Sequence, residues 1–106
     1  MVIPAYAEVK SLKTDKPVYK KGETITFTGT LGVDDSGIVY VVVNDPADAK
    51  AAFKGTFADI DHNFKVDIDT GSSKNSFVTT GIYSATAFID KVEDGIKINF
   101  DFSLDG

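Results

Sequence analysis

Residues Glu23-Thr24-Ile25-Thr26-Phe27-Thr28-Gly29-Thr30-Leu31 decide the fold class, because apolar and polar side chains alternate along them. Ile25, Phe27 and Leu31 fall on one face of an extended chain, and four threonines share the other face. This period of two, with β-branched residues on the polar side, is typical of a half-buried β-strand. A slip of one residue would expose the whole apolar row, so the pattern also specifies how the strand pairs.

The same alternation recurs along the chain, and helical spacing is nearly absent. Residues Asn63 to Thr70 and Ile96 to Leu104 repeat it, whereas Ile38 to Asn44 is more continuously apolar. That run predicts either a central strand covered on both sides or an outward patch at Tyr40 and Val42. Pro46–Phe53 has the composition of a single helical turn, after which Phe53, Gly55 and Phe57 resume the alternation.

About seven strands are expected, and turn-forming residues separate them. The expected strands span residues 7–13, 23–31, 38–44, 52–58, 63–70, 81–90 and 95–104. Short strands at this spacing predict an all-β fold, an antiparallel β-sandwich. No internal repeat or second domain interrupts the pattern, so residues 8–106 are expected to form one domain.

Composition excludes several classes of function. The 106 residues include 11 Lys, no Arg and 16 Asp or Glu, for a net charge of −5. Without Cys there is no disulfide, thiolate nucleophile or zinc knuckle, and a single His rules out blue-copper and multi-histidine centres. The missing arginine and a pI of 4.6 argue against a nucleic-acid partner.

Catalytic groups are scarce in what remains. Paired carboxylates for glycoside hydrolysis must flank a cleft, but the acids here fall in turns or on outward strand positions such as Asp67 and Asp69. A serine triad would have to use His62, and no Gly-x-Ser-x-Gly elbow is present. Lys16, Lys20 and Lys21 near Tyr19 are interpreted as a solvated strand entry. We therefore expect a protein that is not an enzyme and has no cofactor.

Calcium is the one metal with a motif to consider. Asp59, Asp61 and Asn63 match the first three ligand positions of a calcium loop. Phe64 and Thr70 then replace the required glycine and glutamate, so an EF-hand is excluded. Two interpretations stay open: a looser site shared with Asp34, Asp35, Asp45 or Asp48, or a hairpin turn whose side chains cap backbone amides. The turn is favoured.

The N-terminus carries a candidate signal for secretion. Ala5-Tyr6-Ala7 has the small-x-small form of a signal-peptidase site, and Val2-Ile3 would be the end of an apolar segment. Residues 1–7 are therefore interpreted as a signal-peptide remnant, or else as the start of an edge strand. No apolar run approaches the length needed to cross a bilayer, so the chain itself is not expected to span a membrane.

Three motifs share one family likeness. The first is Thr14-Asp15-Lys16-Pro17-Val18-Tyr19-Lys20-Lys21-Gly22-Glu23-Thr24-Ile25-Thr26-Phe27-Thr28-Gly29, the second Val41-Val42-Val43-Asn44-Asp45-Pro46, and the third Gly81-Ile82-Tyr83-Ser84-Ala85-Thr86-Ala87. Together they resemble macroglobulin-type and bacterial immunoglobulin-like domains of surface proteins. At His62-Asn63-Phe64 the glycine that this family often carries is missing. The resemblance implies structural roles for Gly22, in a tight turn, and Tyr83, in a tyrosine corner.

The start of the chain extends this likeness. Ala5-Tyr6-Ala7-Glu8-Val9, followed by the Thr14-Asp15-Lys16 and Tyr19-x-x-Gly22-Glu23 motifs, resembles the mature start of secreted surface proteins from ammonia-oxidising archaea. Those proteins carry tandem immunoglobulin-like domains. The resemblance implies an extracellular or cell-surface location, with neighbouring immunoglobulin-like domains or other proteins as partners. It carries over no catalytic residue.

Three hypotheses for function follow from the sequence. The first is a non-enzymatic spacer or adhesion module of a cell-surface or cell-envelope protein. The second is a self-assembling filament or surface-layer subunit, which would pair by strand addition through Ile96–Leu104 and the N-terminal segment. The third is a glycan- or ligand-binding module with Tyr40, Phe77 or Tyr6 as exposed stacking platforms.

Overall fold

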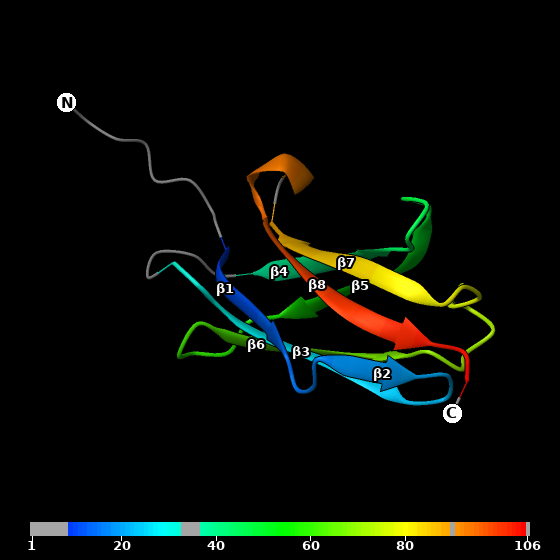
Figure 1. Ribbon diagram of the computed structural model, residues 1–106. Coiled ribbons are helices and arrows are strands. Elements are labelled where there is room, and N and C mark those ends of the chain that lie inside the picture. Colours follow the sequence, from blue (N-terminus) through cyan, green and yellow to red (C-terminus); the bar gives the residue numbers. More distant parts are fainter. Residues whose placement is uncertain (1–8, 33–36, 90, 106) are drawn as a thin grey trace.

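The computed structural model describes residues 9–32, 37–89 and 91–105, which form two facing β-sheets (Figure 1). The strands are β1 (Val9–Thr14), β2 (Val18–Lys20), β3 (Thr24–Leu31), β4 (Ile38–Asn44), β5 (Lys50–Phe57), β6 (Asn63–Asp69), β7 (Gly81–Phe88) and β8 (Ile96–Ser103). A single-turn 3-10 helix, η1 (Val92–Asp94), is the only helix in these residues. The all-β sandwich expected from the alternation is confirmed, whereas residues 1–7 lie outside the described residues.

The two sheets have three and five strands. Their orders are β1-β3-β6 and β2-β8-β7-β4-β5. Every neighbouring pair is antiparallel except β2 and β8, which run parallel. The chain leaves the smaller sheet after Thr14 and enters the larger one at Val18, where the short strand β2 begins. This strand is the one not expected from the sequence, and it raises the number from seven to eight. Pro17 lies between Thr14 and Val18, and it has no N–H to continue a ladder.

The segment Pro46–Phe53 was expected to form a helical turn, and that prediction is wrong. Residues 50–53 belong to β5, and the chain reverses before them in the β4–β5 hairpin. The Asp45 carboxylate closes this turn by accepting hydrogen bonds from the amides of Ala47 and Ala49, both at 2.9 Å. Pairing with β4 therefore overrides the local helical composition.

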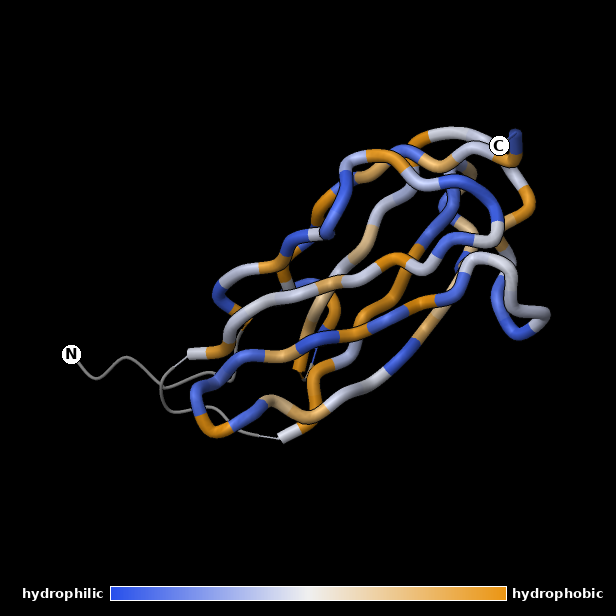
Figure 2. Tube along the Cα trace, turned by 90° about the horizontal axis from the view of Figure 1, so that it is seen from below, coloured by the Kyte–Doolittle hydropathy of each residue, from blue (hydrophilic) through white to orange (hydrophobic). Residues whose placement is uncertain are grey.

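The core lies between the sheets and is built from the inward side of each alternating strand. Figure 2 shows hydrophobic and hydrophilic residues alternating along the chain. The centre of the core is aromatic: the Tyr83 ring stacks on Phe77 at 5.3 Å and meets Phe102 edge-on at the same distance. Along β4 the valines 39, 41 and 43 are buried, while Tyr40 and Val42 face outward. Of the two interpretations of this run, the outward patch is therefore the one observed.

Gly29 marks the tightest packing in the smaller sheet. It pairs with Leu12 of β1 on one side and Phe64 of β6 on the other. A β-carbon at this position would lie 2.2 Å from the Ser11 carbonyl oxygen and 2.5 Å from Cζ of the Phe64 ring. The missing side chain therefore allows Phe64 to enter the core across β3.

We expect Gly29→Ala to destabilise the fold by about 3 kcal/mol, because the new methyl group meets backbone as well as a buried ring. Urea unfolding followed by circular dichroism measures the change. Thr28→Ala, one residue earlier on the half-exposed side of the same strand, is the matched control. An equal effect of both substitutions would contradict the steric explanation.

Candidate functional site

The outer face of the five-stranded sheet carries three neighbouring aromatic rings, Tyr40, Phe53 and Phe88, which we call the aromatic platform. They come from three adjacent strands, β4, β5 and β7. Tyr40 lies 5.5 Å from Phe53, with an angle of 25° between the rings, and 5.7 Å from Phe88. All three rings point away from the core, so the contacts among them stabilise a surface feature.

Gly55 determines how Tyr40 lies. The two residues are directly opposite in the β4–β5 pairing. A β-carbon on Gly55 would lie 3.2 and 3.3 Å from Cδ1 and Cε1 of Tyr40, so one edge of the ring occupies the space that a side chain would fill. An aromatic ring laid over a glycine of an edge strand shields the exposed backbone and fixes the ring orientation.

The platform continues into a larger apolar surface. Phe53 is 51% exposed and Phe57, two residues along β5, is 71% exposed. Ile38 pairs with Phe57 and is also exposed, and Val42 is half-buried between Phe53 and the next strand. The two phenylalanines alone expose roughly 240 Å² of apolar surface. A contiguous apolar patch of a few hundred Å² is ordinary in size for a monomeric domain, and such a patch is often functional.

A groove adjoins the platform where the edge strands β5 and β6 approach each other. Its volume is about 850 Å³, and Phe53 lies at its border with the platform. The ammonium of Lys54 bridges the two strands by donating to the carbonyl oxygen of Asp67 at 2.8 Å. Lys50 lies at the same border, with its Nζ 5.7 Å from the Phe53 ring centroid.

The three residues expected to stack on a ligand have three different outcomes. Tyr40 is part of the platform, whereas Tyr6 lies outside the described residues. The prediction for Phe77 is wrong: its side chain is 0% exposed, because it stacks on Tyr83 in the core. Sequence reasoning missed Phe53 and Phe88. A signal for Phe53 was available, because in a strand Phe53, Gly55 and Phe57 fall on one face, with the glycine between the two aromatic residues.

The calcium motif forms a turn between β5 and β6. Oδ1 of Asp59 accepts hydrogen bonds from the amides of Asp61 and Asn63, at 2.9 and 3.0 Å, while its own amide donates to the Asn63 carbonyl. His62 adopts a positive φ of 65°, the conformation that the missing glycine would favour. The Asp59 carboxylate is thus engaged as a turn cap, as the favoured interpretation holds.

The wider calcium site has no shared location for its ligands. Asp45 and Asp48 lie at the other end of the β4–β5 hairpin from Asp59, roughly 20 Å away along the strands. Asp34 and Asp35 lie outside the described residues. Within residues 9–32, 37–89 and 91–105, no three His, Cys, Asp or Glu side chains are grouped to hold a metal ion.

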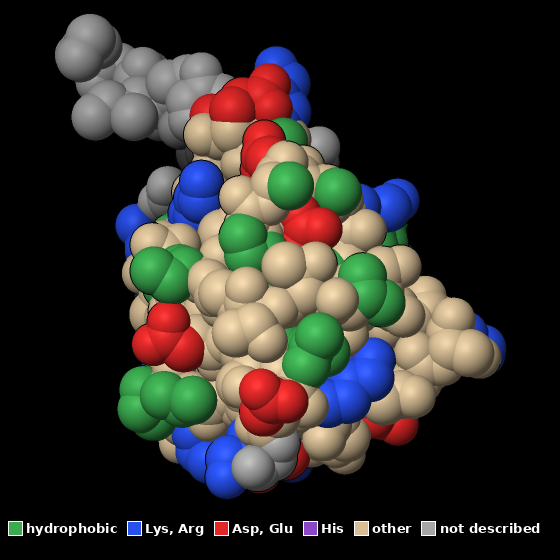
Figure 3. Space-filling model, turned by 45° about the vertical axis from the view of Figure 1, so that its right-hand side comes forward, with side chains coloured by type: hydrophobic (Ala, Val, Ile, Leu, Met, Phe, Trp, Pro, Cys, Tyr) green, Lys and Arg blue, Asp and Glu red, His purple; other side chains and the backbone are tan. Residues whose placement is uncertain are grey.

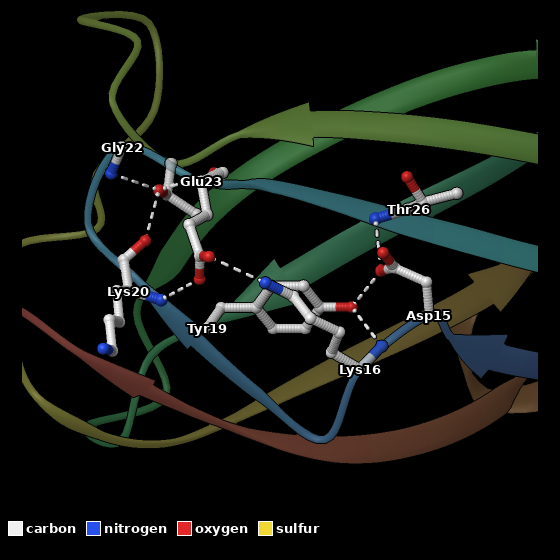
Figure 4. A network of polar contacts seen from close by, with 8 residues as sticks. Asp15, Lys16, Tyr19, Lys20, Gly22, Glu23 and Thr26 are labelled. Carbon is white, nitrogen blue, oxygen red and sulfur yellow. Dashed lines mark hydrogen bonds and ion pairs between the residues drawn. The ribbon is translucent and has the colours of Figure 1, made fainter. Parts of the chain in front are cut away.

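The motif around Tyr19 forms a polar network at the crossing between the sheets (Figure 4). The Tyr19 hydroxyl donates to the Asp15 carboxylate and accepts from the Lys16 amide at 2.9 Å. That carboxylate also accepts from the Thr26 amide of β3. Glu23 completes the network through an ion pair with Lys16 at 2.7 Å. Of the three clustered lysines, Lys16 and Lys21 are therefore engaged within the fold, Lys21 by donating to the Phe77 carbonyl oxygen at 2.8 Å.

These contacts shift three pKa values. The hydrogen bond from Tyr19 lowers the pKa of Asp15, and the contact with Lys16 lowers that of Glu23. Burial, together with the bond to Asp15, raises the pKa of Tyr19 from 10.0 to about 12. Each shift favours the protonation state present at neutral pH, so the network stabilises the fold there.

The two residues expected to be structural both have polar partners at turns. Gly22 has a φ of 95°, and its amide donates to the buried Thr70 hydroxyl at 2.9 Å. The Tyr83 hydroxyl donates to the Thr79 carbonyl at 2.6 Å, and its ring is buried. This is the geometry of a tyrosine corner, and burial raises the pKa of Tyr83.

The strand expected to pair with another subunit, Ile96–Leu104, corresponds to β8. Inside the sheet, β7 pairs with it from Ile96 to Phe102, and β2 pairs with its other side over Asp101–Ser103. Both sides of its C-terminal part are therefore occupied within the chain. No helix of the described residues is long and apolar enough to cross a membrane.

Comparison with known proteins identifies the architecture. No protein-family model and no curated protein sequence matches the chain. A solved structure does: Pseudomonas fluorescens alkylpurine DNA glycosylase AlkC, bound to DNA containing an abasic site analog, matches 91% of this chain with a TM-score of 0.62 and 11% identity. The match covers 30% of the glycosylase chain, so it shows a shared fold for that part alone.

We expect stability to fall as the pH rises from about 10 to about 12. Tyr19 has a higher pKa folded than unfolded, so its contribution is full below the unfolded value of about 10 and is lost as the folded group ionises. Urea unfolding across this range should show a smaller loss in Tyr19→Phe than in the wild type. Tyr40→Phe, outside the network, is the control and should behave as the wild type does.

Calcium is expected to leave the melting temperature unchanged, because the Asp59 carboxylate already caps two amides. Asp59→Ala should lower the stability by about 1 kcal/mol through loss of that cap. Thermal unfolding with and without millimolar calcium measures both effects. A rise in melting temperature with calcium in the wild type, absent from Asp59→Ala, would instead identify a metal site.

Proposed function

We propose that this chain is a non-enzymatic, immunoglobulin-like adhesion module of an extracellular or cell-surface protein. In this proposal, the module binds its partner through the aromatic platform on the outer face of the five-stranded sheet. The motifs around Tyr19, Asp45 and Tyr83 support the family assignment, and the start of the chain supports secretion. The exposure of Phe53 beside Tyr40 and Phe88 is the observation that carries the binding role.

A binding module explains this surface better than an inert spacer does. The outward side of β6 carries the charged residues Lys65, Asp67 and Asp69, as a solvated face requires. On the outer side of β4 and β5, by contrast, apolar residues occupy successive outward positions. Exposing these rings to water is unfavourable, so their presence together on one face favours a role in contact.

The available acids support a role outside catalysis. Asp45 and Asp59 cap turns, and Asp15 and Glu23 serve the network at the crossing between the sheets. In the view of Figure 3, acidic and basic side chains are interspersed among hydrophobic ones, without a large field of one sign. The glycosylase structure contains DNA, but we do not propose DNA binding for this chain, because it has no arginine and a net charge of −5.

Binding of the purified domain to immobilised polysaccharides, neutral and acidic, and to collagen and fibronectin tests this proposal. Surface plasmon resonance should detect a partner in this panel, and Phe53→Ala should weaken that binding by about tenfold, since platform stacking contributes roughly 1 kcal/mol or more per ring. Ile60→Ala, at a fully exposed residue of the β5–β6 turn, is the control. Retention by no probe, or equal binding by Phe53→Ala, would overturn the proposal.

A further inference from the structure

The groove beside the platform has a charge that differs from the rest of the chain. Three lysines, Lys50, Lys54 and Lys74, line it together with two acids, Asp67 and Asp69. In the whole chain acids outnumber lysines by 16 to 11, so the balance is reversed here. Three ammonium groups and two carboxylates give the lining itself a net charge of +1.

The acids in the groove accept hydrogen bonds from within the fold, whereas two of the lysines have no carboxylate partner. Asp67 accepts a hydrogen bond from the Thr26 hydroxyl, and Asp69 accepts one from the Gly71 amide, both at 2.8 Å. Lys54 donates to the Asp67 carbonyl. Neither Lys50 nor Lys74 has a carboxylate within ion-pair distance in the described part of the chain, where Lys16–Glu23 is the ion pair observed. Both carboxylates keep their negative charge, so the lining carries a net charge of +1, and Lys50 and Lys74 are its cations without a carboxylate partner.

Lys50 joins this charge to the platform. Its ammonium lies 5.7 Å from the centroid of the Phe53 ring, which lines both the groove and the apolar face. A ligand that spans this border meets a flat apolar ring and, beside it, a cation. The remaining lining offers short polar side chains, among them Ser72, Asn75 and Ser76, that can exchange hydrogen bonds with hydroxyl groups.

An acidic sugar unit has all three complementary features. The C–H face of its ring stacks on an aromatic side chain, its hydroxyls pair with short polar groups, and its carboxylate or sulfate pairs with an ammonium. An acidic peptide lacks the rigid ring face. A nucleic acid needs many phosphate contacts, whereas this groove offers two uncommitted lysines. A volume of about 850 Å³ is in the range of sites for small ligands, enough for a few sugar units.

We infer that the groove between β5 and β6 binds the acidic groups of a polysaccharide whose sugar rings stack on the aromatic platform. This inference rests on the proposed binding function and names its ligand class. Lys50 and Lys74 bind the carboxylate or sulfate, and Phe53 stacks on the sugar unit at the border. Selectivity for acidic over neutral sugars then comes from the two lysines, and affinity for sugar rings in general comes from the platform.

Isothermal titration and affinity electrophoresis with polygalacturonate test the inference. Fully methyl-esterified polygalacturonate keeps the sugar rings but removes the charge, and it should bind about tenfold more weakly. Dextran sulfate against dextran gives the same comparison for sulfate. Raising the salt from about 50 to about 500 mM should weaken binding of the acidic polymers and leave that of the neutral ones unchanged.

Matched variants assign the effect to the groove. Lys50→Gln with Lys74→Gln should weaken binding of the acidic polymer by about tenfold or more and leave its neutral counterpart unaffected. Lys13→Gln removes a charge from β1, which lies at the opposite edge of the three-stranded sheet from β6 and outside the groove, and should bind as the wild type does. Phe53→Ala should weaken both polymers. Circular dichroism melting checks that each variant is folded.

Several outcomes would overturn the inference. If acidic and neutral polymers bind equally, or if Lys13→Gln matches the double variant, the groove does not select charge, and the proposed platform function still stands. Equal lysine-dependent binding of polyglutamate or single-stranded DNA would show a general polyanion surface instead. Binding to collagen or fibronectin without any polysaccharide would leave an adhesion module with a protein partner. Retention by no probe would remove both proposals.

Discussion

The hydrogen bond from the Tyr19 hydroxyl to the Asp15 carboxylate holds the point at which the chain passes from one sheet to the other. Asp15 is tied to β3 of the smaller sheet through the Thr26 amide, while Tyr19 belongs to β2 of the larger sheet and is fully buried. One side-chain pair thus connects both layers where the backbone ladder is interrupted. The Tyr19 ring also meets Phe100 of β8 edge-on, so the same residue anchors the crossing to the core.

The strand pattern was predictable because burial between two sheets imposes a period of two on each strand. Residues 38–44 were placed within the bounds observed, and residues 63–70 within one residue of them. The parallel β2–β8 pair was not predictable, because three residues after a proline carry too short a pattern to assign a partner. The prediction for Lys50–Phe53 was wrong for another reason. These residues form a strand because they pair with β4, and local composition does not reveal that pairing.

The candidate site was harder to predict than the fold, since an aromatic residue does not reveal from sequence which side of a sheet it faces. Phe77 and Phe53 are both phenylalanines whose sequence neighbours do not indicate their exposure, yet one is buried and the other half exposed. Phe77 follows a loop that two hydrogen bonds hold against the sandwich. The Ser76 amide donates to the Ala51 carbonyl oxygen, and the Lys21 ammonium donates to the Phe77 carbonyl oxygen. Such long-range contacts leave no local period to read.

The residues that suggested a family and the residues that form the platform are largely separate. Tyr19, Gly22 and Tyr83 are directed toward the crossing, a turn and the core, where any sandwich of this topology has the same requirements. Tyr40, Phe53 and Phe88 face away from the core, and the fold does not require aromatic side chains at those positions. Similarity in the first group therefore conveys architecture, whereas specificity must be sought in the second. Because β5 is an edge strand of the larger sheet, Phe53, Lys50 and Lys54 adjoin the groove. Under the proposed function, substitutions of these side chains would change the ligand preference without disturbing the core.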